Sequence, residues 1–224
     1  TEQICVHLQL KENGQQNLKP NSTNNKFVYL ISPNKIKNDN FYKDLALVFS
    51  SKKVSFFQLR LKKETSKKRL IVGKKIKSIC KKYKVKFLIN DDPLLAKKLN
   101  ADGCHLGQED MRIENARKIL KNKIIGVTCH NSVNLAKKAI TSGANYLAFG
   151  AFYLTETKIV KHKANLKILK SVKKITNLPI VAIGGIKHTN YKKLLLNKAN
   201  FLAISGYIWN NKKYKPFEAI KKLK

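Results

Sequence analysis

The chain has 224 residues, of which 47 are Lys or Arg and 13 are Asp or Glu, so its formal net charge is +34 at pH 7. Hydrophobic residues make up 43% of the sequence and recur along its whole length, which indicates a folded protein and excludes a disordered basic tail. A chain of this length can bury a large core, either as one α/β domain or as two small ones.

The positive charge first suggests a polyanion partner, because lysine-rich surfaces attract nucleic acids and anionic membranes. Only four of the basic residues are Arg, although specific recognition of phosphates and bases favours the planar guanidinium. The lysines are spread over every predicted helix, as in a solvated surface of biased composition. We therefore expect no specific nucleic-acid partner and no membrane partner, and only weak, salt-sensitive binding to polyanions.

The four cysteines lie too far apart for a C-x-x-C pair, and two of them, Cys104 and Cys129, lie in apolar stretches where a small thiol packs well. This pattern favours a reducing compartment and argues against zinc. The sequence shows neither a signal peptide nor a run of about 18 apolar residues. We therefore expect a cytoplasmic protein.

Residues 1–26 are mostly polar and rich in turn-forming residues, and we treat them as an N-terminal extension of uncertain order. From Phe27 onward, a short β-branched or aromatic run is followed by a loop and a helix-period segment, and this order repeats. The segments that we expect to be strands are 27–32, 54–60, 86–90, 102–106, 124–129, 145–150, 180–184 and 200–205.

Strands that alternate with helices predict a parallel sheet, and eight such units in about 200 residues fit a closed (β/α)8 TIM barrel better than an open doubly wound sheet. We expect residues 27–224 to form this barrel as a single catalytic domain. Functional groups of such barrels lie at the carboxyl ends of the strands or in the loops just after them.

The acidic residues are few, yet five of the 13 lie within residues 89–110. Asp91 and Asp110 follow adjacent predicted strands, so we expect them to face each other at the barrel mouth. Two carboxylates near neutral oxygens are typical of an Mg²⁺ site. Either acid alone could instead cap a helix, as Asp92 before Pro93 is expected to do. Basic residues nearby favour the metal site.

Three basic residues, Arg60, Lys62 and Lys158, follow different strands and are expected to converge on the same mouth. There they would neutralise a diphosphate that also binds Mg²⁺. A single lysine in so basic a chain is more often a surface residue. The alternation of Gln58, Arg60 and Lys62, however, places polar side chains on a strand face that is normally inward, where charge needs a partner.

Gly184-Gly185 and Ser205-Gly206 follow the last two predicted strands, where barrels often bind a phosphate through backbone N–H groups. Glycines are also common in tight turns, so neither segment alone would indicate a phosphate site. The prediction rests on both segments following neighbouring strands at the usual phosphate position of barrels. His105 and His130 lie at strand ends, and the sequence identifies no partner carboxylate for them. No Ser-His-Asp or Cys-His pattern indicates covalent catalysis.

At these residues the sequence resembles the thiamine-phosphate synthase family, over about residues 27–209. The motifs that carry the resemblance are QLRLK, LINDDPLLAKKLNADGCHLGQED, IIGVTCH, YLAFGAFYLTETK, PIVAIGGI and FLAISGYI. The resemblance implies an Mg²⁺-dependent transferase of thiamine biosynthesis. It would join 4-amino-2-methyl-5-hydroxymethylpyrimidine diphosphate to 4-methyl-5-(2-phosphooxyethyl)thiazole, giving thiamine phosphate and pyrophosphate by a dissociative substitution.

The resemblance also implies a role for each matching residue. Asp91 and Asp110 would hold Mg²⁺. The diphosphate ligands would be Arg60, Lys62, Asn90 and Lys158. The pyrimidine pocket would contain Gln58, His105 and Thr128. The thiazole phosphate would be held by Thr155, Thr157, Gly185, Ile204 and Ser205. The residues expected to take part in the chemistry itself are Arg60, Lys62, Lys158 and Thr128. The partners would be phosphorylated small molecules. A homo-oligomer is kept as a separate hypothesis that the sequence does not decide.

Three departures from the family accompany the resemblance. Thr128 stands where serine is usual, which keeps the hydroxyl and adds a methyl group. GAFYLTETK lacks the prolines of the usual GPxFPTxTK, and ISGYI replaces a more usual VSAI. The nearest alternative is the thiazole tautomerase group, which shares the barrel and the HLGQ stretch but differs at the metal acids and the Thr-x-Thr-Lys loop. A basic nucleic-acid-binding protein on a barrel scaffold is a third hypothesis.

Overall fold

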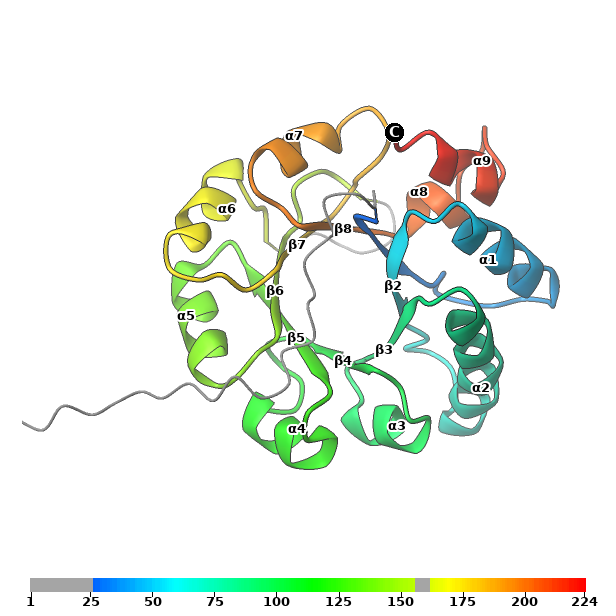
Figure 1. Ribbon diagram of the computed structural model, residues 1–224, viewed down its shortest axis with the longest axis horizontal. Coiled ribbons are helices and arrows are strands. Elements are labelled where there is room, and N and C mark those ends of the chain that lie inside the picture. The colour runs from blue at the N-terminus through cyan, green and yellow to red at the C-terminus, as the bar shows by residue number, and fades with distance from the viewer. Residues whose placement is uncertain (1–25, 156–161) are drawn as a thin grey trace, which may run out of the picture.

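A computed structural model of the chain describes residues 26–155 and 162–224. Eight parallel strands form a closed barrel in which each strand pairs with its neighbours in chain order, and β1 closes the ring against β8. Figure 1 shows the strands around the centre and the helices as an outer ring. The predicted (β/α)8 barrel is confirmed. The predicted extension lies, except for Lys26, outside the described residues, so its boundary stays a prediction.

All eight predicted strands are present, and their ends differ from the prediction by one residue at most. The strands are β1 Val28–Ile31, β2 Val54–Leu59, β3 Lys86–Asn90, β4 Gly103–Leu106, β5 Ile124–His130, β6 Tyr146–Gly150, β7 Ile180–Ile183 and β8 Phe201–Ile204. The helices are α1 Asn40–Ser50, α2 Ser66–Lys82, α3 Pro93–Lys98, α4 Ile113–Leu120, α5 Val133–Thr141, α6 Leu166–Lys173, α7 Lys192–Leu196, α8 Gly206–Trp209 and α9 Pro216–Lys221.

Helices α2, α3 and α5 begin where a short polar side chain satisfies a free backbone N–H group. The Thr65 side chain accepts from Lys68 N at the start of α2, and Ser132 accepts from Leu135 N at the start of α5. Asp92 caps α3 in the same way, with its Oδ1 2.9 Å from Leu95 N. No helix within the described ranges is long and apolar enough to cross a membrane.

Two cores result from the alternation of side chains along each strand. The larger core lies between the outer face of the barrel and the helices. The smaller core fills the barrel itself and is rich in aromatic rings, because Tyr29, Phe56, Tyr146 and Phe201 point inward from four different strands. These rings pack against one another; those of Phe56 and Phe201 meet edge to face with centroids 5.0 Å apart.

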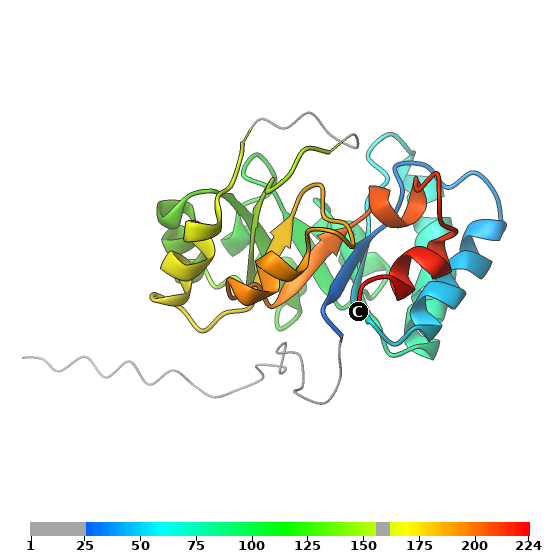
Figure 2. The same cartoon turned by 90° about the horizontal axis from the view of Figure 1, so that it is seen from above.

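The loops that follow the strands all lie on one side of the barrel, the upper side in Figure 2. The parallel arrangement requires this, because every strand runs in the same direction. The polar residues predicted at strand ends therefore gather at one mouth.

Candidate active site

Asp91 follows β3 directly and lies at this mouth. Asp91 has a φ of 64°, in the left-handed region, and its backbone N donates to the carbonyl of His105 at 2.8 Å. The side chain turns to the loop after β2, where one carboxylate oxygen lies 2.6 Å from Lys62 Nζ. Asp92 is the residue that caps α3, so the helix-capping alternative does not apply to Asp91.

Asp110 approaches Asp91 from the turn after β4. Its Oδ2 accepts from Gly107 N at 2.6 Å, which closes the turn. The Asp91 and Asp110 carboxyl groups lie close enough to affect each other's pKa, as the sequence predicts for acids on adjacent parallel strands. Burial and the neighbouring Asp91 raise the pKa of Asp110. Burial also pushes the pKa of Asp91 upward, but Lys62 and Asp110 outweigh it and hold that pKa below its ordinary value. The two carboxyl groups therefore influence each other's ionisation.

This pair fits a divalent cation. Two neighbouring carboxylates offer oxygens of both groups to a hard dication, whose charge would offset the repulsion between them. Among the described residues, no group of three or more His, Cys, Asp and Glu side chains could hold a metal ion. Mg²⁺ keeps several waters and commonly takes only one or two protein carboxylates beside substrate phosphates.

Arg60 lies at the same mouth, but in a loop. The predicted strand 54–60 ends at Leu59, so strand alternation does not place the side chains of Arg60 and Lys62. The buried Ser32 hydroxyl accepts from Arg60 N at 2.9 Å instead, and Arg60 Nη1 donates to Asn34 Oδ1 at 2.9 Å. These contacts bring the loop after β2 against the loop after β1.

A row of hydrogen bonds lies beneath the mouth, inside the barrel. Gln58 Nε2 donates to the Tyr29 hydroxyl at 2.9 Å, and the Tyr29 and Tyr146 hydroxyls are 2.8 Å apart. His105 Nδ1 lies 2.9 Å from the Tyr146 hydroxyl, and His105 Nε2 lies 2.8 Å from Thr128 Oγ1. Burial lowers the pKa of His105 to about 4, so the imidazole is neutral at pH 7.

The loops after β6, β7 and β8 pack against one another beside these groups. Gly185 has a φ of 60°, and a Cβ there would lie 2.1 Å from the carbonyl oxygen of Leu154. Only glycine therefore fits this contact. Thr155 ends the described part of the loop after β6, and Thr157 and Lys158 lie outside the described residues. Ser205 Oγ donates to the carbonyl of Ser32 at 3.1 Å, and Ile204 is buried at the end of β8.

The other acids of residues 89–110 have structural contacts. Asp102 Oδ2 accepts from Phe87 N at 2.8 Å, and its Oδ1 lies 3.2 Å from Lys86 Nζ. Glu109 is exposed. Asp91 and Asp110 therefore stay the predicted metal ligands of this stretch.

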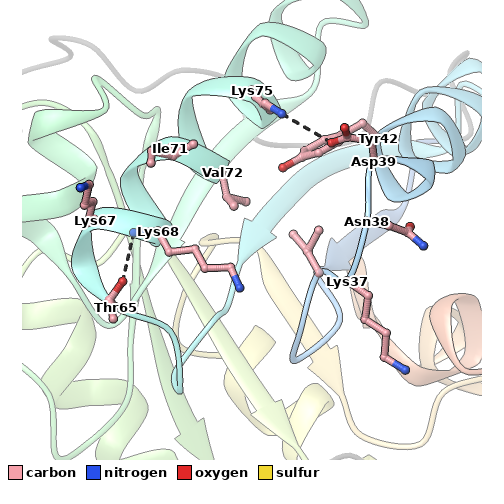
Figure 3. A pocket seen from close by; sticks show the side chains of 11 residues that line it. Lys37, Asn38, Asp39, Tyr42, Thr65, Lys67, Lys68, Ile71, Val72 and Lys75 are labelled. Atoms are coloured by element: carbon pink, nitrogen blue, oxygen red, sulfur yellow. Dashed lines mark hydrogen bonds and ion pairs between the residues drawn. The ribbon is translucent and has the colours of Figure 1, made fainter.

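A separate cavity of about 360 Å³ lies between the loop after β1 and the start of α2 (Figure 3). Four lysines line it, but none of the residues predicted at the site does. Two of these lysines, Lys68 and Lys75, already pair with Glu64 and Asp39. We therefore place the active site at the barrel mouth and not in this cavity.

Sequence reasoning missed four residues that contact predicted site residues: Tyr29, Tyr146, Ser32 and Asn34. The two tyrosines lie within predicted strands, and a Tyr in an apolar strand needs a partner for its hydroxyl, which was an available signal. Ser32 ends the predicted strand 27–32, where functional groups of such barrels lie, so a signal was available for it as well. Asn34 lies in the loop that follows, where polar residues are common, and no signal singled it out.

The fold and the mouth define a class of protein. A (β/α)8 barrel with an acid pair fit for a divalent cation, and with basic residues beside it, is typical of enzymes that bind phosphorylated substrates at the carboxyl ends of the strands.

Comparison with known proteins identifies the family within this class. The family model described as thiamine monophosphate synthase matches residues 28–208. The thiamine-phosphate synthase of Pelagibacter ubique is 80% identical over 207 residues, which cover 92% of this chain and 100% of that protein. The thiamine-phosphate synthase of Nitrosomonas eutropha is 39% identical over 82% of this chain and 86% of that protein. The chain belongs to the thiamine monophosphate synthase family.

Solved structures agree in fold. The thiamine phosphate pyrophosphorylase from Pyrococcus furiosus superposes with a TM-score of 0.76 at 26% identity and covers 89% of this chain and 94% of that one. A 3-hexulose-6-phosphate synthase superposes with a TM-score of 0.63 at 17% identity over 88% of this chain and 98% of that one, which supports the barrel alone.

Proposed function

We propose that the protein is an enzyme that joins 4-amino-2-methyl-5-hydroxymethylpyrimidine diphosphate to 4-methyl-5-(2-phosphooxyethyl)thiazole, with release of pyrophosphate. The activity is that of a thiamine-phosphate synthase. Membership of the family supports the reaction, and the 80% identity over nearly the whole chain is the observation that carries it. The thiazole tautomerase hypothesis is disfavoured, because the metal acids that distinguish the two groups are present and in contact.

The site suits a substitution in which the leaving group departs first. The bond between the pyrimidine methylene carbon and the diphosphate oxygen breaks, and its electron pair leaves with pyrophosphate. The thiazole nitrogen then gives its lone pair to the methylene cation and forms the new C–N bond. No protein nucleophile is needed, and the described mouth offers charge stabilisation for the anion that leaves.

The acid pair and the basic residues would act on the diphosphate end. Asp91 and Asp110 would hold Mg²⁺, which would supply positive charge to the departing oxygens when bound. Lys62, 2.6 Å from Asp91, and Arg60 in the adjacent loop would bind the non-bridging oxygens. We propose the same role for Asn90 at the end of β3. Lys158, which lies outside the described residues, is proposed as a further diphosphate ligand on the resemblance alone.

The remaining predicted residues would hold the rings. Gln58, His105 and Thr128 would form the floor of the pyrimidine pocket, and their contacts within the barrel support this position. The thiazole phosphate would lie against the loops after β6, β7 and β8, held by Thr155, Thr157, Gly185, Ile204 and Ser205. Both substrates are phosphorylated and do not cross membranes unaided, so we propose a cytoplasmic location. A homo-oligomer and a separate N-terminal extension remain proposals.

The decisive experiment mixes the purified protein with both substrates, with and without Mg²⁺, and measures thiamine phosphate and pyrophosphate. We expect the two products in equal amounts, and only when a divalent cation is present. Isomerisation of the thiazole without coupling would instead indicate a tautomerase. Tight, sequence-selective binding of nucleic acid that survives physiological salt would indicate the third hypothesis.

A further inference from the structure

The hydrogen bonds inside the barrel form one unbranched chain from β2 to β5. It runs from Gln58 to Tyr29, then to Tyr146, His105 and Thr128, and each donor–acceptor distance lies between 2.8 and 2.9 Å. Gln58, Tyr29 and Tyr146 are each no more than 2% exposed, so water has little access to this part of the chain. Each buried hydroxyl must therefore donate and accept within it.

The first member fixes the direction of the others. Gln58 Nε2 can only donate, so the Tyr29 hydroxyl accepts from it and gives its own proton to Tyr146. The Tyr146 hydroxyl, which accepts from Tyr29, must then donate to His105 Nδ1. A ring that accepts at Nδ1 carries its proton on Nε2, and this proton points to Thr128 Oγ1. The hydroxyl proton of Thr128 is left for a ligand.

We propose that Tyr29 and Tyr146 are positioning residues that set the tautomer of His105 and so make Thr128 a hydrogen-bond donor to the substrate. This inference rests on the proposed function, in which Thr128 lines the pyrimidine pocket. An aminopyrimidine has ring nitrogens that only accept and an amino group that donates. A donor hydroxyl bonds a ring nitrogen, so the buried chain favours an orientation in which a ring nitrogen, and not the amino group, faces Thr128.

The packing around Tyr146 holds its hydroxyl in place next to His105. The rings of His105 and Tyr146 stack with centroids 5.7 Å apart and planes 18° apart. The residue across from them on β5 is Gly126, where a Cβ would lie 1.8 Å from the carbon that carries the Tyr146 hydroxyl. The absence of a side chain at this position therefore leaves the space that brings the Tyr146 hydroxyl to His105 Nδ1.

The tautomer can be measured without substrate. Long-range ¹H–¹⁵N NMR spectra of protein labelled at its five histidines distinguish a proton on Nε2 from one on Nδ1, and the His105→Gln variant identifies the His105 signals by their loss. We expect the Nε2–H tautomer at neutral pH. A proton on Nδ1, or on both nitrogens, would overturn the proposal. This result is independent of whether the proposed reaction occurs.

Three variants test the role of the tyrosines. Tyr29→Phe and Tyr146→Phe keep the ring and remove the hydroxyl, so His105 is expected to populate both tautomers. The matched control is Tyr191→Phe, which also loses a buried hydroxyl, one that donates to the carbonyl of Lys224 outside the barrel. It is expected to keep the Nε2–H signal. An unchanged tautomer in both barrel variants would reduce the tyrosines to a packing role and overturn the proposal.

Kinetics provide an independent test of the same chain. Tyr146→Phe is expected to raise the KM for the pyrimidine diphosphate about tenfold and to leave the KM for the thiazole phosphate unchanged. In a Thr128→Val background the same change should have less than about a twofold further effect, because the group through which Tyr146 acts is gone. The proposal would be contradicted if the effects of Tyr146→Phe and Thr128→Val were additive. It would also be contradicted if Tyr146→Phe changed the KM values for the two substrates equally. A wild-type protein without coupling activity would refute the proposed function and leave the NMR result standing.

Discussion

The substitution Asp91→Asn removes one negative charge from the acid pair and keeps the shape of the side chain. Asp91 has a φ of 64°, and Asn is one of the few residues that tolerate this conformation. The ion pair that is lost joins side chains that are 51% exposed for Lys62 and 24% exposed for Asp91, so its loss costs about 1 kcal/mol of stability or less. The variant is therefore expected to fold.

Its activity is expected to fall far more than its stability. Removal of one group that stabilises charge in the transition state lowers kcat by a factor of about 100 to 1,000, or about 3 to 4 kcal/mol. The assay measures initial rates of pyrophosphate release against Mg²⁺ concentration with both substrates saturating, and urea unfolding runs in parallel. We also expect Asp91→Asn to need a higher Mg²⁺ concentration for its half-maximal rate.

Asp102→Asn is the matched control from the same acidic stretch. It keeps an oxygen that can accept from Phe87 N and loses the charge that pairs with Lys86, away from the acid pair, so it should cost about 1 kcal/mol of stability or less and leave the rate and the Mg²⁺ requirement unchanged. If Asp91→Asn kept the wild-type rate and Mg²⁺ requirement, Asp91 would not be a metal ligand. If it lost activity only in proportion to unfolded protein, its role would be structural.

Three further predictions concern charge, pH and packing. Arg60→Ala is expected to raise the KM for the pyrimidine diphosphate and lower kcat, with kcat/KM down by a factor of about 100; an effect on stability alone would assign Arg60 a packing role. Because burial lowers the pKa of His105 from 6.5 to about 4, the unfolded chain takes up the proton first as the pH falls. Between pH 6.5 and pH 4 the free energy of unfolding should then drop by up to about 3 kcal/mol more in the wild type than in His105→Gln. The same change with pH in the urea unfolding of the two proteins would contradict this. Gly126→Ala places a Cβ 1.8 Å from the Tyr146 ring and should cost about 3 kcal/mol, whereas Gly143→Ala, with open space but a φ of 86°, should cost about 1 kcal/mol; similar urea midpoints would argue against the clash.

The sequence predicts the barrel well because each strand is marked locally. A run such as KFLIN, bounded by polar residues, identifies β3 without any knowledge of its neighbours. The contact between Asp91 and Asp110 is also predictable, because adjacent parallel strands end on the same side and the acids follow β3 and β4. These inferences need only chain order and the direction of the strands.

The contacts across the barrel could not be predicted in the same way. Tyr29 and Tyr146 are 117 residues apart and lie on β1 and β6, which are not neighbours in the sheet. Whether two such side chains meet depends on the tilt and stagger of the closed barrel, which chain order does not determine. The loop position of Arg60 was missed for a related reason, since β2 ends where its pairing with β1 and β3 ends and not where its apolar pattern ends.

The central claim is that the acid pair and the basic residues at the barrel mouth together hold the diphosphate that leaves. A crystal structure of the protein with pyrophosphate and Mg²⁺ tests it most directly. We predict the metal between Asp91 and Asp110, with the pyrophosphate bound to it and in contact with Arg60 and Lys62. Pyrophosphate bound instead in the lysine-lined cavity between the loop after β1 and α2, with no metal at the acid pair, would contradict the claim.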